Sequence, residues 1–343
     1  MGVNISDIIP KKEIKISDLK GKTIAVDAFN TLYQFLTTIR QPDGTPLMDS
    51  KGNITSHLSG LFYRNLNLMQ EGIRPVYVFD GKPPEMKLAE ITRRKEAKVQ
   101  ARQKYEEAKQ KENLKDMRKY SARDVRITQE IIEESKSLLL AMGIPVIQAI
   151  GEGEAEASYL ARQRKVSASA SQDFDSILYG TPTLIRNLTL SRRRKTPSGL
   201  YVEVNPEMIE LSTVLNKLNI SLDQLICLAI LVGTDYNPGG VKGLGQKRAL
   251  EIVSKFENPV EIFAAVKKNE KYELDFNWQG IFKVFKEYSG DFRRDIKFPE
   301  PDKEKIKEIL LEREFSESRI DSGLEKLDKI KRAQMQKGLK EFF

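Results

Sequence analysis

Cysteine and histidine are almost missing from this chain of 343 residues, which has one of each, Cys227 and His57. A single cysteine excludes an intrachain disulfide and a cysteine-rich zinc site. A single histidine excludes a histidine-rich metal site and leaves acid–base chemistry mainly to carboxylates. Any bound metal is therefore expected to be a hard, oxygen-preferring ion.

Long apolar runs are also missing. The longest strongly apolar run, Leu225–Val232, is far shorter than the ~20 residues of a membrane-spanning helix. The N-terminus has no apolar block of the signal-peptide kind. We therefore expect no membrane partner and a location inside the cell.

Positive charge is concentrated in one segment. The net charge is +8 overall, and residues 82–126 carry 15 Lys/Arg against 8 Asp/Glu, a net charge of +7. Such a segment can attract a polyanion, although a solvated helical face has the same composition. Its Lys, Glu, Ala, Gln and Arg content predicts helices.

Strand and helix patterns alternate along the first half of the chain, which indicates an α/β fold with a parallel sheet. The strand patterns cover 23–27, 75–80 and 166–171, and the helix patterns cover 29–39, 128–142 and 153–164. In such sheets, functional groups gather beyond the carboxyl ends of the strands. After Pro206 the chain becomes mostly helical, and Gly239–Leu250 reads as a glycine-rich hairpin that leads into a helix.

Seven carboxylates stand out, most of them after strand patterns or at the start of a helix pattern, and each taken singly is also typical of a turn or a helix cap. They are Asp27, Asp80, Glu152, Glu154, Asp173, Asp175 and Asp235. If they converge at one sheet edge, their mutual repulsion favours bound cations. Oxygen ligands alone favour Mg²⁺ or Mn²⁺, and a pair of such ions can activate water for phosphodiester hydrolysis.

Several motifs in order resemble those of the flap endonucleases, a family of 5′ nucleases. They are Ala25–Ala28 (AVDA), Val78–Pro84 (VFDGKPP), Glu152–Ala157 (EGEAEA), Gln172–Asp175 (QDFD) and Leu231–Tyr236 (LVGTDY). The resemblance spans about residues 1–256 and resumes at the C-terminus. Its main departure is Glu156, where a small or neutral polar residue is more usual.

The resemblance implies a metal-dependent endonuclease with two Mg²⁺ ions, for which Mn²⁺ is a plausible substitute. Asp27, Asp80, Glu152 and Glu154 would serve chiefly one ion, and Asp173, Asp175 and Asp235 chiefly the other. Lys87 and Arg94 match the basic pair that approaches the scissile phosphate, although ordinary solvated helix cations have the same pattern.

The resemblance also implies DNA contacts, whose positions here are Tyr33, Arg40, Arg64, Gly233, Lys242, Lys247 and Arg248. Tyr33 matches an aromatic residue that stacks on a base, and a buried core tyrosine is the alternative. The glycine hairpin resembles a helix-two-turn-helix element that can hold K⁺, and a plain capping loop is the alternative.

The last eight residues, 336–343, match a motif that binds a replication sliding clamp (PCNA type). Its residues are Gln336, Leu339, Phe342 and Phe343. One helical turn would place Leu339 and Phe342 on one side as an apolar plug. A terminal helix that folds its aromatic residues onto the core is the alternative.

We therefore predict a PIN-like 5′ nuclease core with a mainly parallel sheet, interrupted by an inserted helical arch. The predicted parts are a core of 1–81 and 128–235, an arch of 82–127, a helical DNA-binding region of 236–330 with the helix-two-turn-helix at 239–257, and a flexible clamp-binding tail of 331–343.

The predicted function is structure-specific cleavage of 5′-flap DNA in Okazaki fragment maturation and repair, with possible 5′-to-3′ exonuclease activity. Two alternatives stay open: a related 5′ nuclease for gaps, bubbles or junctions, and a non-catalytic clamp-associated DNA-binding factor. The short tail is more typical of archaeal members, for which a cytoplasmic location is expected; a eukaryotic member would be nuclear.

Overall fold

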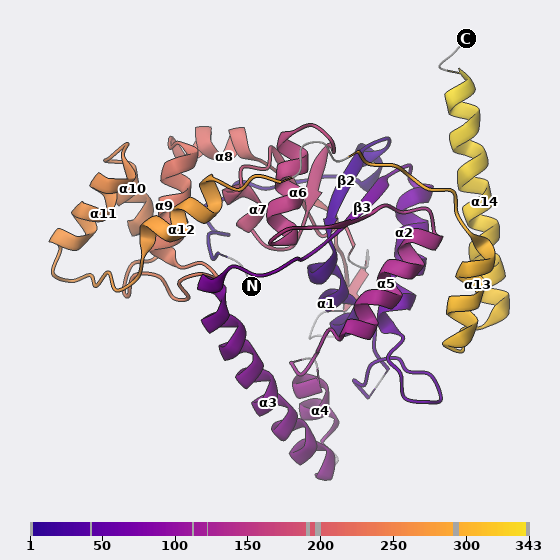
Figure 1. The fold of residues 1–343 in the computed structure, drawn as a ribbon. Coiled ribbons are helices and arrows are strands. Elements are labelled where there is room, and N and C mark those ends of the chain that lie inside the picture. Colours follow the sequence, from indigo (N-terminus) through magenta and orange to yellow (C-terminus); the bar gives the residue numbers. More distant parts are fainter. Residues whose placement is uncertain are drawn as a thin grey trace.

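The fold is built around one seven-stranded sheet, seen in a computed structural model that describes residues 3–41, 43–111, 113–121, 123–189, 193–195, 200–290 and 295–340 (Figure 1). The strand order is β1-β9-β6-β5-β2-β3-β4. The strands are β1 (Lys12–Glu13), β2 (Thr23–Asp27), β3 (Arg74–Phe79), β4 (Val146–Gln148), β5 (Ala168–Ala170), β6 (Thr183–Arg186) and β9 (Glu207–Glu210). Strands β4, β3, β2, β5 and β6 are parallel, and β9 and β1 add an antiparallel edge. The mainly parallel sheet predicted from the sequence is confirmed.

Helices cover both faces of this sheet because alternate side chains of each strand point to opposite faces. In β2, Ile24 and Val26 pack in one apolar cluster with helices α1 (Ala28–Thr38), α2 (Ser56–Gln70) and α5 (Gln129–Ala141). Between them, Ala25 packs in a different cluster with α6 (Gly153–Arg162). The carboxyl ends of the parallel strands therefore lie between two layers of helices.

The basic segment forms an arch that projects from the body (Figure 1). A short 3₁₀ helix, η2 (Glu85–Lys87), leads into α3 (Leu88–Gln110), which pairs with α4 (Leu114–Ser121). Helix α3 buries few of its side chains, among them Glu90, Ala101 and Ala108, because it packs mainly on α4. This helical pair lies within the segment 82–127 for which an arch was predicted.

A second group of helices shares one large apolar cluster beside the sheet. Its members are α7 (Asp175–Leu178), α8 (Leu211–Leu218), α9 (Leu222–Val232), α10 (Gln246–Val253), α11 (Pro259–Lys268) and α12 (Trp278–Lys286). Residues Leu225–Leu231 of α9 are completely buried at the centre of this group. A capping box between Ser221 and Gln224 fixes the start of α9.

The glycine-rich hairpin joins α9 to α10. Gly233 ends α9 with a φ of 113°, and Gly240 has a φ of 55°. A Cβ added to Gly240 would lie 2.4 Å from the Leu231 carbonyl oxygen, so the two passes of the chain touch through their backbones. Only glycine fits this crossing.

The last two helices, α13 (Lys303–Glu312) and α14 (Glu317–Lys340), return to the helices that cover the sheet. Helix α13 packs on α5, and α14 packs on α2 through Ile320, Leu327 and Ile330. Helix α14 continues through Lys340, so residues 331–340, expected as part of a flexible tail, are helical in the structure. Extending a helix from an anchored turn costs little per residue, which explains why a polar sequence continues it.

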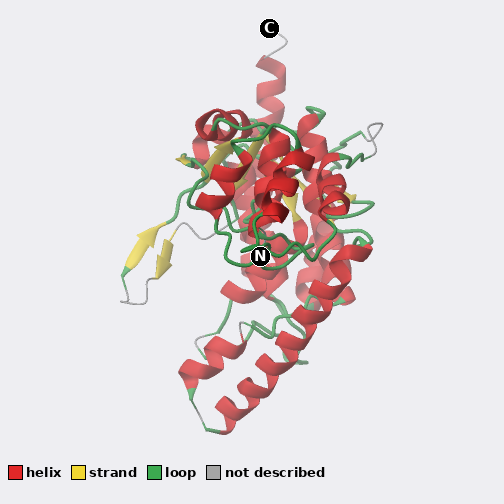
Figure 2. Ribbon diagram, turned by 90° about the vertical axis from the view of Figure 1, so that its left-hand side faces the viewer, coloured by secondary structure: helices red, strands yellow, loops and turns green. Residues whose placement is uncertain are grey.

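Two smaller elements complete the fold. A 3₁₀ helix, η1 (Ile16–Leu19), precedes β2, and a two-stranded hairpin, β7 (Arg193–Lys195) with β8 (Tyr201–Glu203), stands out from the body in Figure 2. Among the described residues, no single helix is long and apolar enough to cross a membrane; only α8 and α9 together, bent by 80°, have that length and composition.

Candidate active site

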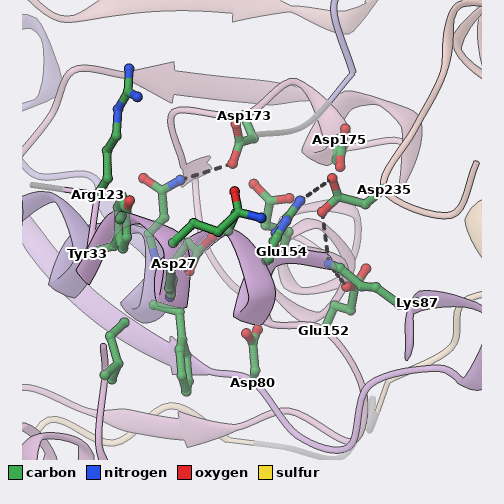
Figure 3. Close-up of a pocket in the computed structure, with 18 of the residues that line it drawn as sticks. Asp27, Tyr33, Asp80, Lys87, Arg123, Glu152, Glu154, Asp173, Asp175 and Asp235 are labelled. Carbon is green, nitrogen blue, oxygen red and sulfur yellow. Dashed lines mark hydrogen bonds and ion pairs between the residues drawn. The ribbon is translucent and has the colours of Figure 1, made fainter. Parts of the chain in front are cut away.

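A cavity of about 610 Å³ lies between the arch and the carboxyl ends of the parallel strands (Figure 3). All seven carboxylates selected from the sequence line it: Asp27, Asp80, Glu152, Glu154, Asp173, Asp175 and Asp235. The arch contributes Lys87, Arg94, Lys98, Lys104 and Arg123. The cavity is therefore acidic on the sheet side and basic on the arch side.

The secondary structure explains why the acids meet. Asp27 ends β2 and Asp80 directly follows β3, two neighbouring parallel strands, so both reach the same sheet edge. The remaining acids lie in loops or first helical turns at this edge: Asp173 follows β5, Glu152 and Glu154 open α6, Asp175 opens α7, and Asp235 follows α9. Segments spread over more than 200 residues of sequence converge there.

Backbone amides fix several of these carboxylates. The Asp27 carboxylate accepts a 3.0 Å hydrogen bond from the Asn30 amide and caps α1. Asp80 Oδ1 accepts from the Gly153 amide at 2.6 Å. Asp175 Oδ1 accepts from the Val3 amide at 2.9 Å, so the N-terminal segment also supports the site.

Burial and mutual repulsion disturb the ionisation of the acids. Burial, then the charge of Asp80, raises the pKa of the Asp27 carboxyl to about 8. Burial, then the charge of Asp235, raises the pKa of Asp175 to about 7. The pKa of Glu154 is also raised well above its usual value, by burial and then by Asp173. The protein alone therefore lacks the positive charge that would keep these carboxylates ionised.

Two cations of the arch meet the acids directly. Lys87 Nζ contacts Glu152 Oε1 and lies 3.2 Å from Asp235 Oδ2. Arg94 Nη2 donates to Asp235 Oδ1 at 2.6 Å, and its Nε donates to Glu90 Oε1 at 2.7 Å. Because Glu90 is buried, its carboxylate fixes the position of the Arg94 guanidinium. Figure 3 shows Lys87 pointing between Glu152 and Asp235.

The donor set suits a divalent metal of the hard class. Carboxylate oxygens are the ligands that Mg²⁺ and Mn²⁺ prefer, and the raised pKa values show that added positive charge would be stabilising here. Within the described ranges, no three Asp, Glu, His or Cys side chains already form a closed ligand cluster. Lys87 and Arg94 bind two of the acids in this state.

The predicted DNA contacts do not all lie together. Tyr33 lines the cavity with an exposed ring, and Lys98 Nζ lies 5.8 Å from the ring centre. Arg64 lines a different cavity of about 750 Å³, away from the seven acids. Arg40 donates at 2.7 Å to the Gly44 carbonyl and also binds Ser121 at the end of α4, so its guanidinium ties the arch to the core.

The other predicted contacts lie on or beside the α9–α10 hairpin or at the C-terminus. Lys242, Lys247 and Arg248 are exposed. Gln336 and Leu339 belong to the last turns of α14, where only the backbone is described, whereas Phe342 and Phe343 lie outside the described residues.

Two buried tyrosines were not singled out from the sequence. Tyr179 donates a 3.0 Å hydrogen bond to Glu152 Oε2, and the Tyr236 hydroxyl binds the same oxygen. Burial and the Glu152 charge raise the pKa of both phenols far above the usual value. Tyr236 stands in the quoted LVGTDY motif, but Tyr179 belongs to no pattern that could have revealed it.

The sequence matches two family models and many known proteins. The XPG N-terminal domain model matches residues 1–101, and the XPG I-region model matches residues 143–235. Flap endonuclease 1 of Pyrococcus horikoshii is 52% identical over 345 residues, covering 100% of this chain and 98% of that protein. Flap endonuclease 1 of Thermococcus onnurineus is 50% identical, covering 100% and 99%.

The fold comparison agrees with the sequence comparison. The structure of flap endonuclease-1 from Methanococcus jannaschii has a TM-score of 0.74 and 41% identity, covering 97% of this chain and 100% of that one. All three of these relatives are archaeal, as the resemblance predicted.

Proposed function

The chain belongs to the flap endonuclease 1 family, and from this we propose that it cuts branched DNA that carries a 5′ single-stranded flap. It hydrolyses one phosphodiester near the junction of flap and duplex and leaves a 5′-phosphate on the downstream duplex. The observation that carries this proposal is the cavity, where seven carboxylates face a basic arch. Such cleavage serves Okazaki fragment maturation and DNA repair.

The metal dependence proposed for this cavity rests on the all-oxygen donor set. We propose two Mg²⁺ ions, replaceable by Mn²⁺, held chiefly by Asp27, Asp80, Glu152 and Glu154 on one side and by Asp173, Asp175 and Asp235 on the other. When bound, such ions activate water and stabilise the leaving oxygen. The raised pKa of Asp27 and Asp175 supports this proposal, because a divalent ion favours the ionised carboxylates and so offsets the burial and repulsion that raise the pKa.

The arch supplies the groups proposed to bind the reacting phosphate. Lys87 and Arg94 already contact the carboxylates. A phosphate that enters the cavity therefore replaces a carboxylate as the anionic partner of each cation. The developing negative charge is then met by fixed cations inside a partly closed site. Exposed Tyr33 offers a ring for stacking on a base beside the scissile bond.

The duplex is proposed to lie along the α9–α10 hairpin. Lys242, Lys247 and Arg248 are exposed there and suit contacts with phosphates, which bind DNA without reading its sequence. Gly233 lets the hairpin fold tightly, and we propose that its backbone carbonyls hold a K⁺ ion. Arg64 is proposed to contact the template or the downstream duplex from its own cavity, and Arg40 to do so after release from Ser121.

The C-terminal motif is proposed to bind a sliding clamp. Helix α14 leads residues 336–340 away from the body (Figure 1), which suits a short anchor for a separate protein. Binding of a PCNA-type clamp can be measured by surface plasmon resonance for the full chain and for a Phe342→Ala/Phe343→Ala variant. The proposal requires the variant to lose at least about tenfold in affinity, with unchanged cleavage in the absence of clamp; equal affinities would contradict it.

Substrate choice tests the proposed function. Labelled DNAs with a 5′ flap, a gap, a bubble, a four-way junction or no branch are incubated with the protein in Mg²⁺. The proposal predicts preferred cutting of the 5′ flap near its junction. Preference for a gap, bubble or junction would replace it with a related 5′ nuclease activity, and tight flap binding without cutting of any DNA would indicate a non-catalytic factor.

A further inference from the structure

Two buried tyrosine hydroxyls bind one carboxylate oxygen of Glu152. Tyr179 is the first residue after α7, and Tyr236 lies in the loop after α9, next to Asp235. Both hydroxyls reach Glu152 Oε2, the Tyr179 hydroxyl at 3.0 Å, and the two hydroxyl oxygens are 2.7 Å apart. The other oxygen, Oε1, faces the cavity and contacts Lys87.

The two hydroxyl oxygens and Glu152 Oε2 form three close contacts, but two O–H groups can donate only two hydrogen bonds. Either both phenols donate to Glu152 Oε2, or one donates to the other, which then donates to Oε2. In both arrangements Oε2 accepts from a buried neutral donor. The carboxylate therefore has one oxygen committed to the protein and one directed into the cavity.

The rings that carry the hydroxyls are themselves fixed. The Phe285 ring of α12 lies 4.9 Å from the Tyr179 ring and 5.4 Å from the Tyr236 ring, measured between centres. Tyr179 also packs edge-on against Tyr288 at 6.0 Å. Tyr179 is 2% exposed and Tyr236 is 8% exposed, so neither ring can turn away without opening the core.

We propose that Tyr179 and Tyr236 are positioning residues that orient Glu152 so that a single oxygen, Oε1, serves the metal-dependent reaction. This inference rests on the proposed function, because Glu152 is a ligand only if the cavity holds divalent ions. The hydroxyl pair acts through Glu152 and does not touch the substrate. Since Phe285 packs on both rings, the orientation of Glu152 also depends on the placement of α12 in the helical region.

The test removes the hydroxyls and leaves the rings. Tyr179→Phe, Tyr236→Phe and the double variant are compared with Tyr77→Phe, whose buried hydroxyl donates to Asn65 Oδ1 at 3.1 Å within the sheet core. Mn²⁺ binding to the DNA-free protein is measured by electron paramagnetic resonance. Flap cleavage is measured across a Mg²⁺ titration, and stability by thermal unfolding in EDTA.

Groups that orient a metal ligand typically change metal affinity about 10- to 100-fold when they are removed. We expect each site variant to weaken Mn²⁺ binding by about that factor and to raise the Mg²⁺ concentration for half-maximal cleavage in parallel. High Mg²⁺ should restore most of the rate. The double variant should lose little more than the worse single variant, because both hydroxyls act on one oxygen. Tyr77→Phe should change stability alone.

Two outcomes would overturn the proposal. One is Mn²⁺ affinity within twofold of the unaltered protein in all three site variants. The other is a loss of cleavage in the site variants that high Mg²⁺ does not restore, accompanied by a loss of stability like that of Tyr77→Phe. If the unaltered protein fails to cut flap DNA, the proposed function fails, but the Mn²⁺ affinities still decide whether the hydroxyls position Glu152.

Discussion

Replacing Asp27 with asparagine should stabilise the metal-free protein while removing its cleavage activity. The Asp27 carboxyl is buried, and its pKa lies at about 8 instead of 3.8. A carboxyl with a raised pKa in the folded state holds its proton more tightly there than in the unfolded chain. The fold therefore loses stability as the pH rises from about 4 to about 8, and the neutral amide of asparagine avoids this loss.

The magnitude follows from the shift. Each pH unit above 3.8 costs about 1.4 kcal/mol until the folded-state pKa is reached, which sets an upper limit of about 4 kcal/mol at pH 7. Asparagine can still accept the Asn30 amide hydrogen bond as the cap of α1. We expect Asp27→Asn to be more stable than the unaltered protein by about 1–4 kcal/mol at pH 7, and by close to nothing at pH 4.

Urea unfolding in EDTA between pH 4 and pH 8 measures this difference, followed by circular dichroism and by the fluorescence of Trp278. Asp302→Asn is the matched control, since Asp302 caps α13 through the Lys305 amide at 2.9 Å but is exposed. That exchange removes an exposed carboxyl and not a buried one, so it should not stabilise the protein at pH 7. A variant at position 27 that is less stable at pH 7, or a difference independent of pH, would refute the reasoning.

Three further changes probe the arch, the hairpin and the C-terminal helices. Lys87→Ala frees two carboxylates, so Mn²⁺ binding to DNA-free protein should tighten several-fold while single-turnover flap cleavage falls about 100-fold or more; weaker Mn²⁺ binding would contradict this. Gly240→Ala places a Cβ 2.4 Å from the Leu231 carbonyl oxygen and should cost about 2 kcal/mol or more in urea unfolding, whereas Gly52→Ala, with open space around it, should cost less. Arg313→Ala removes the ion pair with half-buried Glu134 and should destabilise the protein by about 1–3 kcal/mol. An unchanged urea unfolding midpoint would show that this ion pair does not hold α13 in place.

The sheet and the acidic side of the cavity could be predicted because they depend on local patterns. Thr23–Asp27 reads as an apolar strand that ends in an acid, and parallel strands place such ends at one edge. The structure has β2 at these residues, and Asp27 lies in the cavity with the six other selected acids. Their role as metal ligands stays a prediction.

Contacts that depend on tertiary packing could not be predicted in the same way. Tyr179 reads as an ordinary core aromatic, and only the fold brings its hydroxyl to Glu152, 27 residues away in the chain. Arg40 was selected as a DNA contact, and no pattern in the sequence around it predicts that it binds the Gly44 and Ser121 oxygens. Helix α14 is mostly polar beyond Ile330, so its continuation comes from the packed turns before it.

The most direct test of the proposed mechanism is single-turnover cleavage of a labelled 5′-flap duplex in Mg²⁺ by the unaltered protein and by Asp175→Ala, with DNA binding of both measured separately. The metal-dependent mechanism predicts Mg²⁺-dependent cutting near the junction by the unaltered protein and loss of cutting by the variant, with binding retained. Undiminished cutting by Asp175→Ala, or binding without cutting by the unaltered protein, would contradict it.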